Sequence, residues 1–155
     1  MQSSIDEPDS LSIKKKIAPS KAITPAEIPG ILAIDVGITE KMIMEGVMII
    51  DVRKKIEFAE GRIPGALFIP YKEKSPKIPN LNKFQLKKGK DKFSEVKLEQ
   101  YIGGRSQKVI LYCERDYDWR AYKAAQWLKD SGFTGVHWYR GGFSAWKVAG
   151  KPIEK

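Results

Sequence analysis

The stretch VILYCERDYDWRAYKAAQWLK, residues 109–129, joins an apolar run to a polar loop and then to a segment with the spacing of a helix. The run Val109 to Tyr112 has no polar interruption, which is typical of a strand buried on both faces in a parallel sheet. Cys113, the single cysteine of the chain, follows this run directly. We therefore expect its thiol at the mouth of a strand-to-helix turn, where α/β proteins place reactive groups.

Short apolar runs alternate with helix-forming segments along the rest of the chain. Asp35 is expected to cap a helix that Gly46 ends, and Ser94 to cap another that ends at Gly103. Further strands are expected at residues 31–34, 47–50, 66–69 and 136–139, and further helices at 56–59, 119–129 and 143–148. The alternation predicts an α/β domain of three layers with a central, largely parallel five-stranded sheet.

The length of 155 residues suits one domain with a proper core and is too short for two ordinary domains. Residues 1–22 are polar and lack a sustained apolar period, so we expect a flexible tail there. The domain is expected to span residues 23–155, with a long insertion at about 70–106. Connections of this length are either functional or decorations of the fold.

Composition limits the classes of function. The formal charge of +9 comes mostly from lysines, many of them between Lys72 and Lys97. No nucleic-acid motif accompanies them, so a solvated lysine-rich face is favoured, with attraction of small anions or of an acidic protein partner as the functional alternative. No run reaches the ~18 to 20 apolar residues of a membrane span, and a single cysteine cannot form an intrachain disulfide.

Two further signatures flank the cysteine. IIDVR at 49–53, EF at 57–58 and GRIPGA at 61–66 precede it, and GF at 132–133, GGFSAW at 141–146 and AG at 149–150 follow it. Together with the cysteine segment they resemble the rhodanese family of sulfurtransferases, over roughly residues 31–153. The resemblance implies a rhodanese-like fold. It also implies ping-pong chemistry in which the cysteine takes sulfane sulfur from a donor such as thiosulfate or polysulfide, holds it as a persulfide, and passes it to a thiol or cyanide acceptor.

The resemblance assigns roles to the residues of the loop. Cys113 is the expected catalytic nucleophile, and Arg120, aligned through Ala124 and Ala125 with the arginine that closes the family's loop, would stabilise negative charge. Backbone amides around the sulfur would form a cradle for substrate. The expected substrate-binding residues are Glu114, Arg115, Asp116, Tyr117, Asp118, Trp119 and Arg120.

The loop departs from the family's usual spacing. Sulfurtransferases of the family show C-x4-R and their phosphatase relatives C-x5-R, whereas Cys113 to Arg120 is C-x6-R, with three acids and two arginines in the segment. An unpaired carboxylate some ~7 Å from the sulfur would disfavour the thiolate by about 2 kcal/mol. Whether the acids point outward or pair with arginines therefore controls reactivity.

Two charged residues lie near the end of the strand at 47–50. Asp51 and Arg53 could contact substrate, but at the end of a buried strand they are expected to be structural and to join loops through salt bridges. Arg140, before the Gly141-Gly142 turn, could supply a cation to an anionic donor, and a surface role is the alternative. His137 has no serine or metal-ligand partner at a telling spacing and is not expected to act as a general base.

A closer resemblance concerns an exported bacterial subgroup associated with quinoprotein alcohol oxidation. The tryptophan in the loop, the long insertion, the IPG at 28–30 and the VHWY at 136–139 carry it. Members of that subgroup have a second loop cysteine, where this chain has Tyr117 or Asp118, so a dithiol mechanism is not expected. The likeness favours the periplasm over the cytoplasm if Met1 replaces a removed signal peptide.

Two other classes of function remain open at this point. One is a noncatalytic rhodanese-like module that binds a protein partner. The other is an oxyanion enzyme of the phosphatase or arsenate-reductase type, which the enlarged loop would accommodate and its acids would oppose. No motif implies a metal or an organic cofactor.

Overall fold

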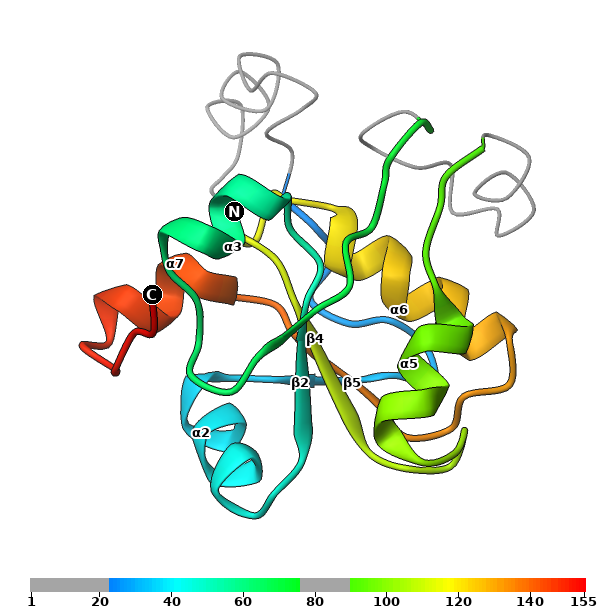
Figure 1. Ribbon diagram of the computed structural model, residues 1–155, viewed down its shortest axis with the longest axis horizontal. Coiled ribbons are helices and arrows are strands. Elements are labelled where there is room, and N and C mark those ends of the chain that lie inside the picture. Colours follow the sequence, from blue (N-terminus) through cyan, green and yellow to red (C-terminus); the bar gives the residue numbers. More distant parts are fainter. Residues whose placement is uncertain (1–22, 76–89) are drawn as a thin grey trace, which may run out of the picture.

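The computed structural model describes residues 23–75 and 90–155. The expected flexible tail, 1–22, and the middle of the expected insertion lie outside the described residues. Figure 1 shows a central sheet with helices packed on both of its faces. The elements in chain order are β1 (Leu32–Ile34), α2 (Val36–Met44), β2 (Met48–Asp51), α3 (Lys55–Glu60), β3 (Leu67–Phe68), α5 (Glu95–Ile102), β4 (Val109–Tyr112), α6 (Arg120–Asp130), β5 (Val136–Tyr139) and α7 (Gly142–Val148).

The five strands form one sheet in the order β1-β5-β4-β2-β3, and every pair of neighbours in it is parallel. The predicted α/β class and five-stranded sheet are therefore confirmed. β4 lies in the middle, with Ile110 opposite Ile49 of β2 and His137 of β5. The carboxyl end of the central strand, where Cys113 follows, is thus flanked by the ends of both neighbours.

Successive side chains of the strands pack alternately into two hydrophobic cores, one on each face of the sheet. Val109 and Leu111 of β4 share one core with residues of α5 and α6, whereas Ile110 and Tyr112 share the other with residues of α2 and α7. Both sets are fully buried. This burial on both faces explains why β4 is an unbroken apolar run.

The helix ends follow the expected capping residues. The Asp35 carboxylate accepts a hydrogen bond from the Ile38 amide at the start of α2, and the Ser94 hydroxyl accepts one from Lys97 at the start of α5. Gly103 ends α5 in the left-handed conformation. Helix α6 runs from Arg120 to Asp130, one residue later at each end than expected.

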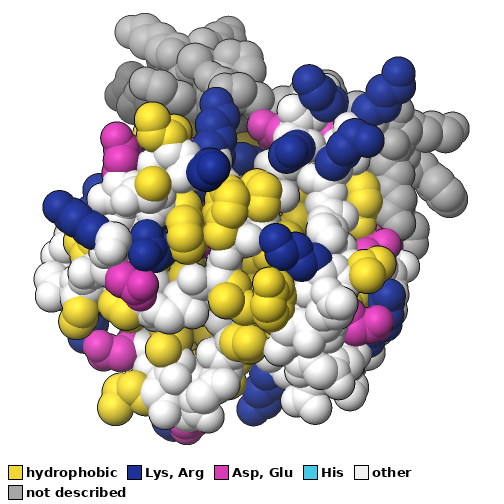
Figure 2. All heavy atoms as spheres, viewed as in Figure 1, with side chains coloured by type: hydrophobic (Ala, Val, Ile, Leu, Met, Phe, Trp, Pro, Cys, Tyr) yellow, Lys and Arg dark blue, Asp and Glu magenta, His cyan; other side chains and the backbone are white. Residues whose placement is uncertain are grey.

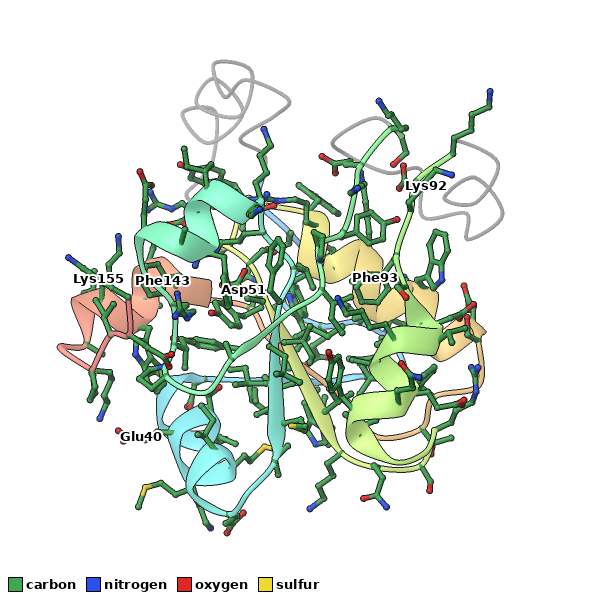
Figure 3. All side chains as sticks on the ribbon, viewed as in Figure 1. Glu40, Asp51, Lys92, Phe93, Phe143 and Lys155 are labelled. Carbon is green, nitrogen blue, oxygen red and sulfur yellow. The ribbon has the colours of Figure 1, made fainter. Side chains whose placement is uncertain are left out.

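The base of the expected insertion is fixed to the domain. The Asp91 carboxylate accepts hydrogen bonds from the Tyr71 hydroxyl at 2.6 Å and from the Lys74 and Ser75 amides, each at 2.6 Å. Phe93 packs against Tyr71 with 5.7 Å between ring centroids, and Lys92 beside it points away from the domain (Figure 3). The buried Asp91 carboxylate therefore joins the described segments on the two sides of residues 76–89.

Tyr112, the last residue of β4, ties the central strand to its surroundings. Its hydroxyl donates to Asp51 Oδ2 at 2.6 Å and accepts from the Ile63 amide at 3.1 Å. Tyr139 at the end of β5 is also buried, but its hydroxyl has no hydrogen-bond partner among the described residues. Removal of the hydroxyl should therefore lower the free energy of unfolding more at Tyr112 than at Tyr139.

We expect Tyr112→Phe to lower the free energy of unfolding by about 1–3 kcal/mol, because it leaves a buried amide and a buried carboxylate each without one partner. Tyr139→Phe, the matched control, should change it by less than about 0.5 kcal/mol. Urea denaturation followed by circular dichroism measures both. Equal losses for the two variants would contradict this account of the Tyr112 hydroxyl.

Candidate active site

Cys113 lies at the carboxyl end of β4 and at the mouth of the turn into α6. Its side chain is 2% exposed. The thiol donates to the Asp118 carbonyl oxygen at 3.3 Å, and Sγ accepts from the Ala121 amide at 3.4 Å. The sulfur is therefore enclosed by the loop and by the first turn of α6.

The Asp118 side chain is turned into the loop. Its carboxylate accepts hydrogen bonds from the Glu114 amide and the Arg120 amide, both at 3.1 Å. The Asp118 amide itself donates to the Arg115 carbonyl oxygen at 3.0 Å. Three of the amides that were expected to form a cradle for substrate thus donate to groups of the loop, and two of these three donate to the Asp118 carboxylate. Among the residues that the structure describes, the Ala121 amide, just beyond the expected set, is the one backbone amide that donates to the sulfur.

Arg120 is held by two carboxylates. Its guanidinium donates to Asp118, with Nη2 to Oδ2 at 2.5 Å, and to Glu57 of α3, with Nη1 to Oε1 at 2.9 Å. Of the three loop acids, Asp118 therefore pairs with Arg120, which the sequence had left undecided. Glu57 was not among the expected site residues, although it belongs to the EF pair of the upstream signature.

Arg53 is the second arginine beside the loop, and its side chain is buried. It donates through Nη2 to Asp51 at 2.7 Å and through Nη1 to Glu114 at 3.0 Å, and its guanidinium lies over the Phe143 ring at 4.4 Å. In Figure 3, Asp51 is labelled near the middle of the molecule and Phe143 to its left. Through Glu114, this arginine connects the end of β2 to the cysteine loop.

The turn before α7 supports the other side of the loop. The Phe143 amide donates to the Cys113 carbonyl oxygen at 3.0 Å, and the Ser144 amide donates to that of Glu114 at 2.9 Å. The Ser144 hydroxyl also donates to Glu114 Oε2 at 2.9 Å. Gly142 permits this approach, because a Cβ atom there would lie 2.5 Å from the Cys113 carbonyl oxygen.

The remaining loop residues contact one another and Thr24. Arg115 is exposed and sits over the Tyr117 ring at 4.8 Å. The Asp116 carbonyl oxygen accepts from the Thr24 hydroxyl at 2.7 Å. Arg140 in turn donates to the Thr24 carbonyl oxygen at 2.6 Å. Arg140 thus steadies the outer edge of the loop and does not face the thiol.

Trp119, the expected substrate-binding residue before α6, has two neighbourhoods. It is buried and packs edge-on against Tyr122, with 4.9 Å between ring centroids. It also lines the cleft above the loop. It therefore contacts the helix that it precedes and borders the cleft.

A cleft of about 1070 Å³ lies over the loop, between α3 and the base of the insertion. Asp118 and Arg120 are among the described residues that line the cleft, and Cys113 is not. Basic side chains form an exposed rim, and Figure 2 shows Lys and Arg gathered along the upper part of this face. The rim lysines are Lys54, Lys55, Lys72 and Lys74. A molecule in the cleft meets the Asp118–Arg120 pair before it meets the thiol.

The electrostatics of the loop keep the thiol protonated. Burial, together with the charge of Asp118, raises the pKa of Cys113 well above its ordinary value, and Arg120 and the Ala121 amide act in the opposite direction. Burial opposes the ionisation of Asp118, but its hydrogen bonds from Arg120 hold its pKa below the usual value. At neutral pH the loop thus contains an ionised carboxylate and a neutral thiol.

In the part of the chain that the structure describes, no group of three or more His, Cys, Asp or Glu side chains is placed to hold a metal ion. Within the same ranges, no helix is long and apolar enough to span a membrane.

Comparison with known proteins places this geometry in a family. The sequence model of the rhodanese-like domain family matches residues 36–149. The chain is 29% identical to thiosulfate sulfurtransferase 16, chloroplastic, from Arabidopsis thaliana, over 79% of this chain and 92% of that protein. It is 30% identical to a sulfurtransferase from Allochromatium vinosum, over 70% of this chain and 79% of that protein.

Solved structures show the same fold. The human single-domain sulfurtransferase TSTD1 superposes with a TM-score of 0.52 at 20% identity, covering 75% of this chain and 95% of that one. The Alr3790 protein from Anabaena superposes with a TM-score of 0.55 at 23% identity, covering 78% of this chain and 79% of that one. The chain belongs to the rhodanese-like domain family, and its relatives support a sulfurtransferase-like function at the level of that family.

We expect alkylation of Cys113 by iodoacetamide to be slow at neutral pH and to rise with an apparent pKa above about 8.5, the value of an ordinary thiol, because burial and Asp118 disfavour the thiolate. The rate is measured from pH 6 to 10 by mass spectrometry, with a cysteine-containing peptide as the reference. A midpoint at or below that of the peptide would show that the loop activates the thiol instead.

We expect Gly142→Ala to lower the free energy of unfolding by about 2–4 kcal/mol, because the new methyl group would displace the backbone of the cysteine loop. Gly150→Ala is the matched control: Gly150 also has a positive φ of 71°, but no heavy atom lies within 4 Å of an added Cβ. It should lose only about 1–2 kcal/mol for the left-handed backbone. Thermal and urea denaturation compare the two, and a Gly142→Ala loss no larger than that of Gly150→Ala would refute the close approach.

Proposed function

We propose that the protein is a sulfurtransferase that carries sulfane sulfur as a persulfide on Cys113. The observation that carries the proposal is the position of the thiol at the end of β4, where the Ala121 amide donates to Sγ and Arg120 stands beside the loop. A helix N-terminus and a guanidinium are the groups that stabilise an anionic sulfur. The family match over residues 36–149 includes all of them.

The first half-reaction moves one sulfur atom without net oxidation. The Cys113 thiolate attacks the sulfane sulfur of the donor, a bond forms between the two sulfurs, and the donor's own S–S bond breaks. The electron pair of that bond leaves with the remainder of the donor, as sulfite from thiosulfate or as a thiolate from an organic persulfide. The enzyme is left with a Cys113 persulfide.

The second half-reaction restores the thiol. A thiolate or cyanide acceptor attacks the outer sulfur of the persulfide, and the Cys113–sulfur bond breaks with its electron pair retained on Cys113. The products are an acceptor persulfide or thiocyanate and the free enzyme. In this scheme Arg120 and the Ala121 amide would stabilise the anionic sulfur in both steps.

The donor and acceptor classes rest on the family resemblance. A small anionic donor such as thiosulfate or polysulfide, and a thiol or cyanide acceptor, are the proposed partners, with an acidic protein as a further candidate for the basic rim. Membership of the exported subgroup, and with it a periplasmic location, stays a prediction.

A noncatalytic binding module is the second candidate function. It is favoured by the burial of Cys113 and by the occupation of the loop amides by Asp118. The oxyanion enzyme is less well supported, because the same carboxylate stands where a phosphate or arsenate dianion would need those amides.

We expect the native protein to gain the mass of one sulfur atom after incubation with polysulfide, and to lose it with release of thiocyanate on addition of cyanide. Cys113→Ser, which removes the nucleophile and little volume, should gain none. Intact-protein mass spectrometry measures the gain. No gain by the native protein, with circular dichroism showing an intact fold, would leave the binding module as the function.

A further inference from the structure

The ion-paired side chains around the cysteine loop form a layer that is negative in sum. The two arginines beside the cysteine, Arg53 and Arg120, contact four carboxylates, so these six side chains carry a net charge of −2. The four carboxylates are those of Asp51, Glu57, Glu114 and Asp118. Each guanidinium contacts two carboxylates, so neither has uncompensated positive charge with which to bind a dianion.

Asp118 stands at the centre of this layer. Its carboxylate binds the Glu114 and Arg120 amides and the Arg120 guanidinium. Those are the donors that an anionic ligand of the loop would use. The Asp118 carboxylate therefore occupies the site in which the loop would otherwise bind an anionic ligand. Because it is covalently held in the loop, its effective concentration there is high, and a free anion must compete with it.

The basic rim does not reverse this effect at the sulfur. Lys54, Lys55, Lys72 and Lys74 are exposed, so water and salt screen their charges. The Asp118 side chain, by contrast, is only 13% exposed. Water therefore screens its charge less, and the charge acts on the thiol and on a donor that approaches the thiol. The rim lysines can attract a negatively charged molecule to the cleft. The ion-paired side chains around the loop, which are negative in sum, repel a donor whose reacting sulfur group carries two negative charges.

We propose that Asp118 selects the sulfur donor by excluding dianions from Cys113, so that the site takes sulfane sulfur from organic persulfides, whose reacting end carries at most one negative charge, in preference to thiosulfate. The inference rests on the proposed function and names its donor class. The step is Cys113–SH plus R–S–SH giving Cys113–S–SH plus R–SH. The bond to the donor's terminal sulfur breaks, its electron pair leaves with R–S, and the proton of the Cys113 thiol goes to that leaving thiolate.

The test compares donors and variants. Asp118→Asn removes the charge and keeps the shape and an oxygen acceptor for the Arg120 amide. Glu60→Gln, which removes an exposed acid of α3 that does not line the cleft, controls for net charge. Initial rates of sulfur loading from thiosulfate and from glutathione persulfide are measured by intact-protein mass spectrometry at equal donor concentration.

We expect the native protein and Glu60→Gln to load from glutathione persulfide at least about tenfold faster than from thiosulfate. In Asp118→Asn the ratio of the thiosulfate rate to the persulfide rate should rise by about tenfold or more, because the repulsion and the internal competitor are both removed. An unchanged ratio in Asp118→Asn would overturn the proposal. Slower loading from both donors would also overturn it, and would make Asp118 a residue that positions Arg120.

A second measurement separates failure of this proposal from failure of sulfur transfer itself. Cys113 is alkylated with iodoacetamide, which is neutral, and with iodoacetate, which is its anionic counterpart. Asp118→Asn should raise the ratio of the iodoacetate rate to the iodoacetamide rate by severalfold, and Glu60→Gln should leave it unchanged. Asp118→Ser, which keeps a short side-chain oxygen as an acceptor, gives the same comparison if the asparagine variant does not fold. If no donor loads sulfur yet this ratio rises, the sulfurtransferase assignment fails and the charge filter stands. If the ratio is constant, the charge filter fails.

Discussion

The buried ion pair between Asp51 and Arg53 is the constraint on which the site depends. Asp51 ends β2, and its carboxylate accepts from the Arg53 amide at 2.9 Å, from the Arg53 guanidinium and from the Tyr112 hydroxyl at the end of β4. Arg53 also donates to the Gly61 carbonyl oxygen at 2.6 Å and to Glu114. A charge pair this deeply buried is tolerable only when nearly all of its donors and acceptors are bonded. Satisfying it fixes the ends of two central strands, the segment after α3 and the first residue of the cysteine loop relative to one another.

A second network continues from the first and determines the chemistry of the sulfur. Arg120 joins Asp118 in the loop to Glu57 on α3, and Asp118 in turn holds the loop amides. A single arginine with a free guanidinium would lower the pKa of the thiol. Here each arginine is shared between carboxylates, so burial and the Asp118 charge prevail and the thiol stays protonated. The loop, which is two residues longer than is usual in the family, thus contains a carboxylate, that of Asp118, bound to its own amides.

Much of the fold could be predicted from local sequence. The strands are short apolar runs, and Asp35 and Ser94 mark helix starts because their side chains satisfy amides within one turn. The position of Cys113 follows from β4 in the same way. Local patterns could not show that Asp118 turns inward or that Arg120 reaches Glu57, because Glu57 and Arg120 are 63 positions apart. The contact of the Gly142 turn with the loop is likewise a product of how β5 and α7 pack beside β4.

The most direct test of this account is a crystal structure of the protein after reaction with an organic persulfide. The account predicts one additional sulfur atom bonded to Cys113 Sγ, with the Asp118 carboxylate withdrawn from the Glu114 and Arg120 amides and the Asp51–Arg53 pair unchanged. An unmodified Cys113 beneath an Asp118 that still occupies the loop, in crystals fully exposed to the donor, would contradict it.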